Sequence, residues 1–342
     1  MNGLPPPRLK NPTQSDVARL AAVSQSVVSY VLNRDAVAPV APETRRRVIA
    51  AVAELGYVPD RAARALRTRK TATIAAIIPD ITNAFYPAFV RGVQDVAEGH
   101  GYDLIVHNTD GDADKEARFL HTVQGRVDGI IGVFFHLRAT DLRPLLDRGV
   151  GVVRLEATPQ EIGPLPLDNL YVDNVAAARD AVAFLIGRGH RRIAMIAGQG
   201  GPRQPRVRGY RDALAAHGIA ADPPLLAETE FVEGGGYEAM RELLRVAPRP
   251  TAVFAANDLL ALGALVALRE AGLRVPADIA VVGFDDIPAA RLVGPALTTV
   301  AQFPQALGRR AAELLVERLS GLAPAGGRCE ERPYELVVRE SA

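Results

Sequence analysis

The sequence has few of the features that mark secreted, membrane-spanning or disulfide-stabilised proteins. Cys329 is its single cysteine, so the chain cannot form a disulfide framework or a cysteine metal site. There is no run of about 18 apolar residues, the length that a membrane helix needs. The Pro-rich residues 1–10 lack the apolar stretch of a secretory signal. These absences predict a cytoplasmic protein without a membrane segment.

Common catalytic patterns are also missing. The six histidines show no H-E-x-x-H spacing, and no G-x-S-x-G motif is present. Gly198-Gln-Gly-Gly and Gly234-Gly-Gly lack the spacing of a dinucleotide loop and the lysine of a phosphate loop, so we interpret them as ordinary strand-to-helix loops. We therefore expect no enzymatic activity, no metal and no cofactor.

Charge is small in total but unevenly distributed. The net charge of the chain is +1, yet residues 1–70 carry twelve Lys and Arg against five Asp and Glu, a net +7, which leaves −6 for the remainder. A basic segment beside an acidic body is typical of a nucleic-acid binder. Arginine-rich helix faces that are merely solvated would give the same asymmetry.

Residues 13–33 predict two short helices joined by a tight turn at residues 21–23. Thr13 and Asp16 have the spacing of a capping box, and Ser24 can cap the second helix. The apolar positions expected to face inward are Val17, Ala18, Leu20, Val27, Val28, Val31 and Leu32. A helix-turn-helix of this kind lays its second helix in the major groove of DNA. The alternative is an ordinary helical hairpin.

A third helix follows, with Pro42 at its first position and Gly56 at its end. Its apolar positions are Val48, Ile49, Val52 and Leu55. We therefore expect a disordered tail over residues 1–12, an all-α DNA-binding domain over 13–58 and a basic linker over 59–71. The linker is too short to be a stable helix by itself.

After residue 71 strand-like runs alternate with helical patterns in two series, over residues 74–155 and 175–284. A helix over 305–319 and a strand over 334–338 close the chain. This repetition predicts an α/β core of two parallel-sheet subdomains. Because ligands bind beyond the carboxyl ends of parallel strands, two facing sheets would hold a ligand between them.

Several stretches, in this order and spacing, are similar to the LacI/GalR family of bacterial transcription regulators. They are Asp-Val-Ala-Arg-Leu-Ala-Ala-Val-Ser (16–24), Val-Ser-Tyr-Val-Leu-Asn (28–33), Glu-Leu-Gly-Tyr-Val-Pro-Asp (54–60), Ile-Pro-Asp-Ile-Thr-Asn-Ala-Phe-Tyr (78–86), Arg-Gly-His-Arg-Arg-Ile-Ala (188–194), Ala-Asn-Asp-Leu-Leu-Ala-Leu-Gly (256–263), Val-Gly-Phe-Asp-Asp-Ile-Pro (282–288) and Leu-Thr-Thr-Val-Ala-Gln (297–302). The resemblance implies a homodimer whose paired headpieces read a palindromic operator. It also implies a periplasmic-binding-protein-like core, with an N-subdomain of about 72–173 and 301–331 and a C-subdomain of about 174–300 and 332–342. Since no leucine heptad follows the last predicted strand, we expect no tetramer.

By position in the family, Gln25, Ser26 and Tyr30 would contact bases. The resemblance implies backbone contacts for Thr13, Ser24, Ser29 and Asn33, and minor-groove contacts in a hinge helix for Ala63 and Leu66. Two alternatives are that Tyr30 packs on the third helix and that the linker is a flexible basic tether. Ala22 stands where the family usually has a turn glycine, which would strain alanine if the turn needs a positive φ.

In the core, the resemblance implies ligand contacts for Arg206, Asn257, Asp285 and Gln302. Such side chains supply the paired donors and acceptors that a sugar needs. Candidate aromatic platforms, each of which could instead be core, are Phe85, Tyr86 and Phe231, and weaker polar candidates are Asp80, Asn83 and Asp173. Asp258 and Asp286 are expected to cap helices.

Together these features predict a ligand-responsive repressor of carbohydrate-related genes, in which a small molecule alters the ordering of the hinge on DNA. A purine or another metabolite could serve as the effector. The alternative from another class is a solute-binding or sugar-metabolising α/β protein without an operator.

Overall fold

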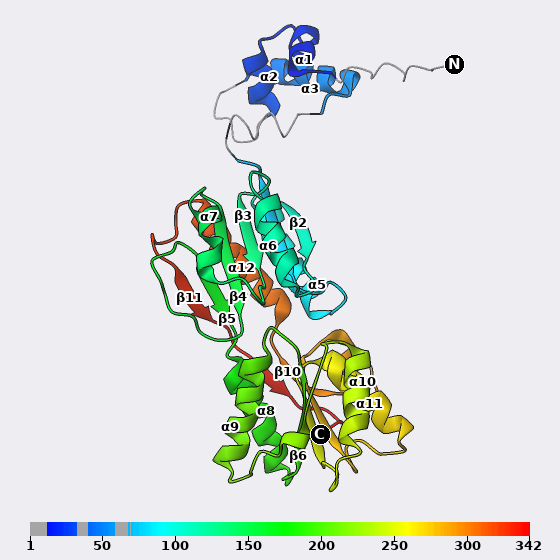
Figure 1. Ribbon diagram of the computed structural model, residues 1–342. Coiled ribbons are helices and arrows are strands. Elements are labelled where there is room, and N and C mark those ends of the chain that lie inside the picture. The colour runs from blue at the N-terminus through cyan, green and yellow to red at the C-terminus, as the bar shows by residue number, and fades with distance from the viewer. Residues whose placement is uncertain (1–11, 33–39, 59–67, 69) are drawn as a thin grey trace, which may run out of the picture. The chain divides into compact units, whose positions relative to one another are not determined.

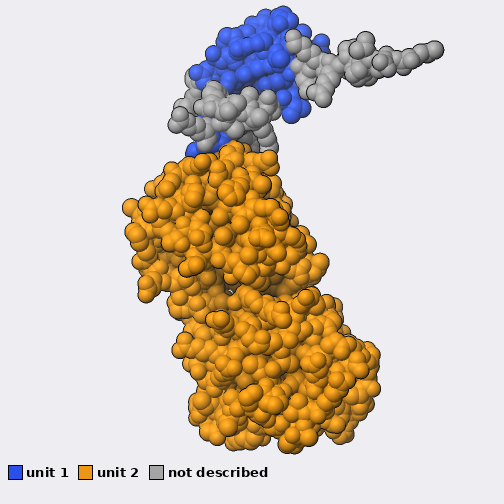
Figure 2. All heavy atoms as spheres, viewed as in Figure 1, with its two compact units in different colours: residues 1–70 blue, residues 71–342 orange. Residues whose placement is uncertain are grey.

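The computed structural model describes residues 12–32, 40–58, 68 and 70–342. The chain divides into two compact units, residues 1–70 and residues 71–342 (Figure 2). Each unit has hydrophobic core residues of its own. None of the helices in these described ranges is long and apolar enough to cross a membrane.

The described part of the first unit contains α1 (Gln14–Leu20), α2 (Gln25–Leu32) and α3 (Pro42–Leu55). Its centre is one fully buried valine from each helix, namely Val17, Val28 and Val48. The predicted boundaries of α3 are confirmed, and Gly56 ends it with a left-handed φ of +59°. The inward position predicted for Leu20 is wrong, since its side chain is 45% exposed, and Ile49, an apolar position of α3, is 53% exposed.

The turn between α1 and α2 does require a positive φ. Ala22 adopts a φ of +50°, a conformation that costs an L-residue roughly 1–2 kcal/mol. The capping box that starts α1 is confirmed, because Thr13 N–H donates to Asp16 Oδ2 at 2.9 Å and Asp16 N–H donates to Thr13 Oγ1. The helix-turn-helix thus forms in spite of its unfavourable turn residue.

The first lobe of the core is a parallel sheet in the order β11-β5-β4-β3-β1-β2 (Figure 1). Its strands are β1 (Thr73–Ile78), β2 (Asp103–Asn108), β3 (Gly129–Gly132), β4 (Gly151–Glu156), β5 (Asp168–Tyr171) and β11 (Arg328–Glu331). Its helices are α5 (Phe85–Gly99), α6 (Ala113–Thr122), η1 (Ala139–Leu142), α7 (Arg143–Leu146) and α12 (Pro304–Leu319). Residues 74–78 are all fully buried, as expected for a parallel strand covered on both faces.

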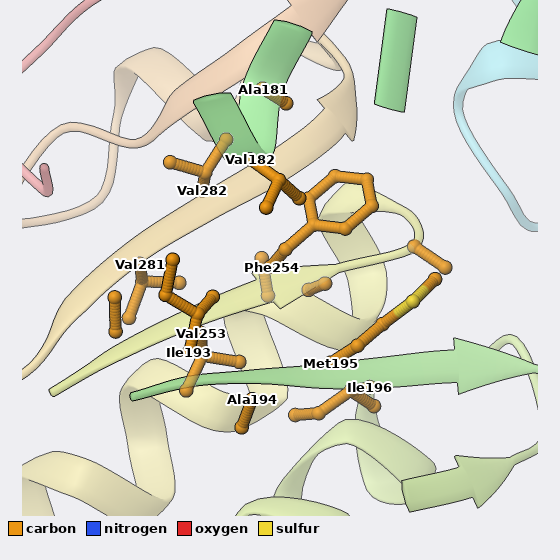
Figure 3. Close-up of a cluster of buried hydrophobic side chains, with 14 of the residues drawn as sticks. Ala181, Val182, Ile193, Ala194, Met195, Ile196, Val253, Phe254, Val281 and Val282 are labelled. Atoms are coloured by element: carbon orange, nitrogen blue, oxygen red, sulfur yellow. The ribbon is translucent and has the colours of Figure 1, made fainter. Parts of the chain in front are cut away.

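The second lobe is a sheet in the order β12-β10-β9-β8-β6-β7, in which only β12 runs antiparallel to its neighbour. Its strands are β6 (Ile193–Gly198), β7 (Leu226–Thr229), β8 (Ala252–Ala255), β9 (Ala280–Asp285), β10 (Thr298–Ala301) and β12 (Glu335–Val337). Its helices are α8 (Asn174–Gly187), α9 (Arg203–Ala216), η2 (Pro223–Leu225), α10 (Glu233–Leu243), α11 (Asp258–Glu270) and η3 (Pro288–Arg291). Val182, Met195 and Phe254 lie in its core (Figure 3).

The chain passes between the lobes after β5, after β10 and after β11, so late strands return to both sheets (Figure 1). Phe303 in the second passage has a φ of +53°, and Tyr334 in the third donates its hydroxyl hydrogen to Asp180 Oδ2 at 2.6 Å. Both sheets were predicted from the sequence, but their strands β5, β10 and β11 were not. These three strands have four residues each and stand next to the passages between the lobes.

Candidate functional site

A cleft of about 890 Å³ is lined by residues of both lobes in the second unit. The structure places all nine predicted effector-site residues in its lining: Asp80, Asn83, Phe85, Tyr86, Arg206, Phe231, Asn257, Asp285 and Gln302. Most of them follow the carboxyl ends of strands, where open α/β sheets hold their ligands. Asp173, a weaker candidate, instead caps α8 by accepting from Val175 N–H and Ala176 N–H at 3.0 Å each.

Arg206 is the most constrained cation of the cleft. Its side chain is buried, Nε donates to Asn174 Oδ1 at 2.7 Å, and Nη1 donates to the carbonyl oxygen of Ala256. Its guanidinium carbon lies 3.8 Å from the centroid of the Phe284 ring, a cation–π geometry. Nη2 is 3.8 Å from Asp285 Oδ1. Arg206 is thus held by the fold while one edge of its guanidinium faces the opposing carboxylate.

Asp285 is the last residue of β9 and combines backbone strain with burial. Its φ is +117°, rare for a residue other than glycine, and such strain is concentrated at functional sites. Gln302 Nε2 donates to Asp285 Oδ1 at 2.7 Å. Burial raises the pKa of Asp285 to about 6, although Arg206 and Gln302 oppose the rise. Asp285 therefore changes charge close to neutral pH.

The cap of α11 differs from the prediction. Asn257, not Asp258, is the N-cap, because Asn257 Oδ1 accepts from Leu260 N–H at 2.9 Å. Asp258 instead accepts from Thr299 Oγ1 at 2.5 Å and from Ile287 N–H at 2.8 Å. Burial raises the pKa of Asp258 well above its usual value.

Asp286 was also expected to cap a helix, and that prediction is wrong. Its carboxylate accepts from Arg291 Nη2 at 3.0 Å and from Arg339 Nη2 at 2.5 Å.

Two polar candidates lie in the loop between β1 and α5 of the first lobe. Asp80 Oδ1 accepts from Thr82 N–H at 2.8 Å, and Asn83 Oδ1 accepts from Phe85 N–H at 3.1 Å. The last two contacts shape the loop that leads into α5.

Aromatic rings line the cleft from both lobes. The rings of Phe85 and Tyr86 meet edge to face with their centroids 5.2 Å apart. Phe85 also packs in the first-lobe core, so the alternative role of Phe85 as a core residue is confirmed. Burial, followed by the nearby Asp285, raises the pKa of the Tyr86 hydroxyl. The Phe231 ring lies against Gly198, where a Cβ atom would approach the ring to 2.3 Å.

Sequence reasoning missed Phe135, which contacts the opposite lobe. A Cβ atom on Gly201 would lie 2.5 Å from the Phe135 ring, and Gly200 lies beside the same ring. The glycine-rich stretch at 198–201 therefore leaves room for the aromatic rings of Phe231 and Phe135. The loop that carries Phe135 is fixed by Glu116, a fully buried carboxylate that accepts the backbone N–H groups of residues 135, 136 and 137 at 2.8, 3.0 and 3.1 Å.

Arg154 and Glu156 also line the cleft and were missed. Arg154 Nη2 lies 2.5 Å from Glu156 Oε1 and donates to the carbonyl oxygen of Leu137 at 3.2 Å. Their signal in the sequence is two charges at alternate positions of the otherwise apolar strand β4. Asn174, the partner of Arg206, gives no such signal.

In the first unit, α2 presents a polar surface. Gln25, Ser26 and Tyr30 are exposed, Tyr30 by 46%, which disfavours packing of Tyr30 on α3. Gln25 Nε2 donates to Ser15 Oγ, and Gln14 Nε2 donates to the carbonyl oxygen of Gln25 at 3.2 Å. Of the predicted backbone contacts, Thr13 and Ser24 are exposed and Ser29 is half-buried.

Some predicted positions lie outside the described residues. They are Asn33, the hinge residues Ala63 and Leu66 with most of the linker, and the tail up to residue 11.

A helix-turn-helix unit joined to a two-lobed core with a polar cleft defines a ligand-sensing DNA-binding regulator. The profile of the lacI family of bacterial regulatory proteins matches residues 13–60, and that of a periplasmic binding protein-like domain matches residues 182–342. Catabolite control protein A of Priestia megaterium is 36% identical over 337 residues, which cover 97% of this chain and 99% of that protein. The chain belongs to the lacI family of bacterial regulatory proteins.

Solved structures agree over nearly the whole chain. The complex of the transcriptional regulator CelR with cellobiose has a TM-score of 0.71 at 36% identity, covering 97% of this chain and 100% of that one. The lac repressor dimer bound to operator and the anti-inducer ONPF has a TM-score of 0.83 at 28% identity, covering 97% of this chain and 99% of that one.

Proposed function

We propose that this chain is a cytoplasmic, homodimeric repressor of carbohydrate-related genes whose affinity for a palindromic operator depends on a polyhydroxylated ligand in the cleft. The observation that carries the proposal is the cluster of Arg206, Asp285 and Gln302, which lines the cleft together with aromatic rings. A sugar hydroxyl both donates and accepts hydrogen bonds, so a fixed guanidinium beside a carboxylate suits it.

The DNA-binding part of the proposal rests on α2. Its exposed Gln25 amide can pair with adenine, Ser26 can contact several bases, and Tyr30 can contact a thymine methyl group or a phosphate. Operators of relatives that carry arginine at the position of Tyr30 are therefore poor guides to this operator. The basic charge of residues 1–70 supplies the phosphate attraction.

Coupling between the two units follows from linkage. We propose that the ligand changes the angle between the lobes and thereby the placement of Ala63 and Leu66 in the minor groove. Ligand and operator must then alter each other's affinity by the same factor, typically about 1–3 kcal/mol.

A homodimer is supported by an apolar sheet edge. β2 is the edge strand of the first lobe, and Ile105 and Val106 on it are 43% and 41% exposed. An edge of this kind is usually covered or paired in native proteins.

The experiment is a gel-shift titration of the full chain on genomic duplex fragments from 50 to 200 mM salt, with and without sugars. We expect affinity to fall steeply with salt, because each neutralised phosphate adds nearly one to the logarithmic slope. We also expect one class of sugar to shift operator affinity. Absent or salt-independent binding would refute the repressor and favour a solute-binding protein.

A further inference from the structure

We propose that the second lobe carries an additional DNA-binding surface at its end away from the cleft, which holds the phosphates of a second duplex without reading its sequence. The surface consists of the loops that precede four strands of the second sheet, and we call it the basic tip. Its loops are residues 188–192, 217–225, 244–251 and 271–279. This inference goes beyond the proposed function, which concerns the operator and the cleft.

The four loops lie along one edge of the sheet. They precede β6, β7, β8 and β9, which are parallel and adjacent in the order β7-β6-β8-β9. His190 Nδ1 lies 3.0 Å from Thr251 Oγ1, and Arg192 Nη1 donates to Asp222 Oδ2 at 2.8 Å, so three of the loops are in direct contact. Because neighbouring strands are about 4.8 Å apart, the edge formed by the four loops is about 15 Å long.

The basic tip and the linker lie at opposite ends of the second unit. Residues that follow the same strands, among them Gln199, Glu230 and Asn257, line the cleft, so the loops before these strands face away from it. The linker enters the first lobe just before β1, at the amino end of the first sheet. We therefore assign to the basic tip a duplex other than the one that the helix-turn-helix binds.

The basic tip is positively charged on an acidic body. Its loops contain six arginines against two aspartates, a net +4, whereas residues 71–342 as a whole carry −6. Both aspartates already have a cation, because Asp222 accepts from Arg192 and Asp278 accepts from Arg274 Nε and Nη2 at 2.9 Å each. The other four arginine side chains are exposed and form no ion pair or hydrogen bond with the residues that the structure describes: Arg188, Arg191, Arg245 and Arg249.

Helix dipoles alone do not account for this charge. Four helices end at the basic tip, and the carbonyl groups of helix ends attract cations. The same edge of the first lobe provides the comparison, since α5, α6 and α7 end there before β2, β3 and β4. The three loops between these elements, residues 100–102, 123–128 and 147–150, contain two arginines and two aspartates, a net charge of zero. The excess of arginine is therefore particular to the second lobe.

The composition of the basic tip favours DNA over a protein partner. The large apolar side chains of its loops are buried or half-buried, so it lacks the apolar centre of a protein interface. Arginine presents paired N–H groups that match a phosphate. Each strand of a duplex carries one phosphate per 3.4 Å of its axis, so an edge of about 15 Å faces roughly four phosphates. That number equals the number of arginines without a carboxylate partner.

The test is a bridging assay with the full chain. An immobilised duplex of random sequence is loaded with protein, and capture of a labelled second duplex is measured from 50 to 200 mM salt. We expect capture of the second duplex to weaken about 40-fold over this range, because three neutralised phosphates give a logarithmic slope of about 2.7. Polyglutamate of similar charge is offered in a parallel experiment as the model of an acidic protein.

A variant of the basic tip locates the contact. Replacing Arg188, Arg191 and Arg249 together by glutamine should lower capture of the second duplex at 50 mM salt at least about tenfold. Binding to the immobilised duplex should stay within about twofold, because that contact belongs to the helix-turn-helix. Thermal melting confirms that the variant is folded.

The matched control replaces three exposed arginines of the first lobe by glutamine, namely Arg118, Arg126 and Arg148. It lowers the net charge of the chain by the same three units and should capture the second duplex like the wild type. Equal capture by the wild type and the tip variant would overturn the proposal, because the second duplex is then held elsewhere. Equal losses in both variants would also overturn it, since only the net charge then matters.

Two outcomes separate this inference from others. Capture of polyglutamate without capture of a second duplex would mean that the basic tip binds an acidic protein, and would overturn the assignment to DNA. Operator binding with a sugar response but without a second duplex would overturn the inference and leave the proposed function intact. Capture that depends on the basic tip, without a specific operator, would do the reverse.

Discussion

The two walls of the cleft hold their polar groups in different ways. On the second-lobe wall, Asp285 ends β9 and Arg206 is bonded to Asn174 and to the backbone after β8, so strand ends fix the groups directly. On the first-lobe wall, the loop beside Arg154 depends on the three N–H groups that Glu116 accepts. Strands thus fix charged groups on both walls, whereas the loop of the first-lobe wall that carries Phe135 is held by one buried carboxylate, Glu116.

This difference separates two tasks. A wall fixed by strand ends can hold a strained, charged residue such as Asp285, because the stability of the surrounding sheet offsets the strain energy. The loop of the first-lobe wall that carries Phe135 can change its residues without altering the sheet, because loops tolerate variation. We infer that the second-lobe wall provides affinity for a hydroxylated ligand in general, whereas the first-lobe wall selects among such ligands.

The largest effect is expected for Arg206→Leu on the second-lobe wall. Removing the guanidinium leaves Asn174 and Asp285 buried without their cation, and breaking a buried pair typically costs about 3–5 kcal/mol. We expect ligand affinity to fall by about 100-fold or more in isothermal titration, with operator binding retained.

The matched control for that variant is Arg208→Leu, two positions along α9. Arg208 is exposed and forms a surface ion pair with Asp212 at 3.6 Å, a contact of little energy. It should bind ligand like the wild type. Similar losses in both variants, or a normal sugar response in Arg206→Leu, would contradict the distinction between the walls.

An intermediate effect is expected from pH, again on the second-lobe wall. Asp285 has a pKa of about 6, so only about a tenth of the molecules carry its charge at pH 5 and most carry it at pH 7. If the ionised form accepts the ligand hydroxyls, affinity should fall about tenfold over that range. Calorimetry on the wild type and Asp285→Asn measures it; asparagine also adopts positive φ more readily than most residues.

The contribution of Asp285 to the free energy of unfolding should change with pH in the direction opposite to ligand affinity. The folded pKa of Asp285 lies above the unfolded value, so between about pH 4 and 6 the native state binds more protons. The contribution of Asp285 to the free energy of unfolding is therefore present at low pH and lost as pH rises through about 6. An identical pH dependence of unfolding in wild type and Asp285→Asn would contradict this pKa.

The residues of the second-lobe wall could be predicted from the sequence better than those of the first-lobe wall. Arg206, Asn257, Asp285 and Gln302 were predicted from the resemblance to the LacI/GalR family, and all four line the cleft. Capping was assigned to Asp258 instead of Asn257 because both residue types cap helices, and only the backbone register decides between them.

Phe135 and Glu116 could not be found in this way. Glu116 looks like a solvated residue in the first turns of a charged helix, yet it is fully buried by a loop about twenty residues further along the chain. The Phe135 ring lies beside Gly200 and Gly201 of the other lobe. The periodicity of a local stretch of sequence cannot indicate a contact between residues of different lobes. In the first unit, likewise, Leu20 and Ile49 fit the helical period but lie at the edge of a core too small to cover them.

The smallest effect is expected for Gly201→Ala, where the two walls meet. Gly201 has a φ of +46°, and a Cβ atom there would lie 2.5 Å from the Phe135 ring. Gly218→Ala is the matched control, since Gly218 has a φ of +66° with no atom within 4 Å of an added Cβ, so it carries only the backbone cost of roughly 1–2 kcal/mol. Displacing the ring should weaken ligand binding about threefold beyond the control, because the contact between the lobes is lost. Equal ligand affinities in the two variants would mean that Phe135 does not help to close the cleft.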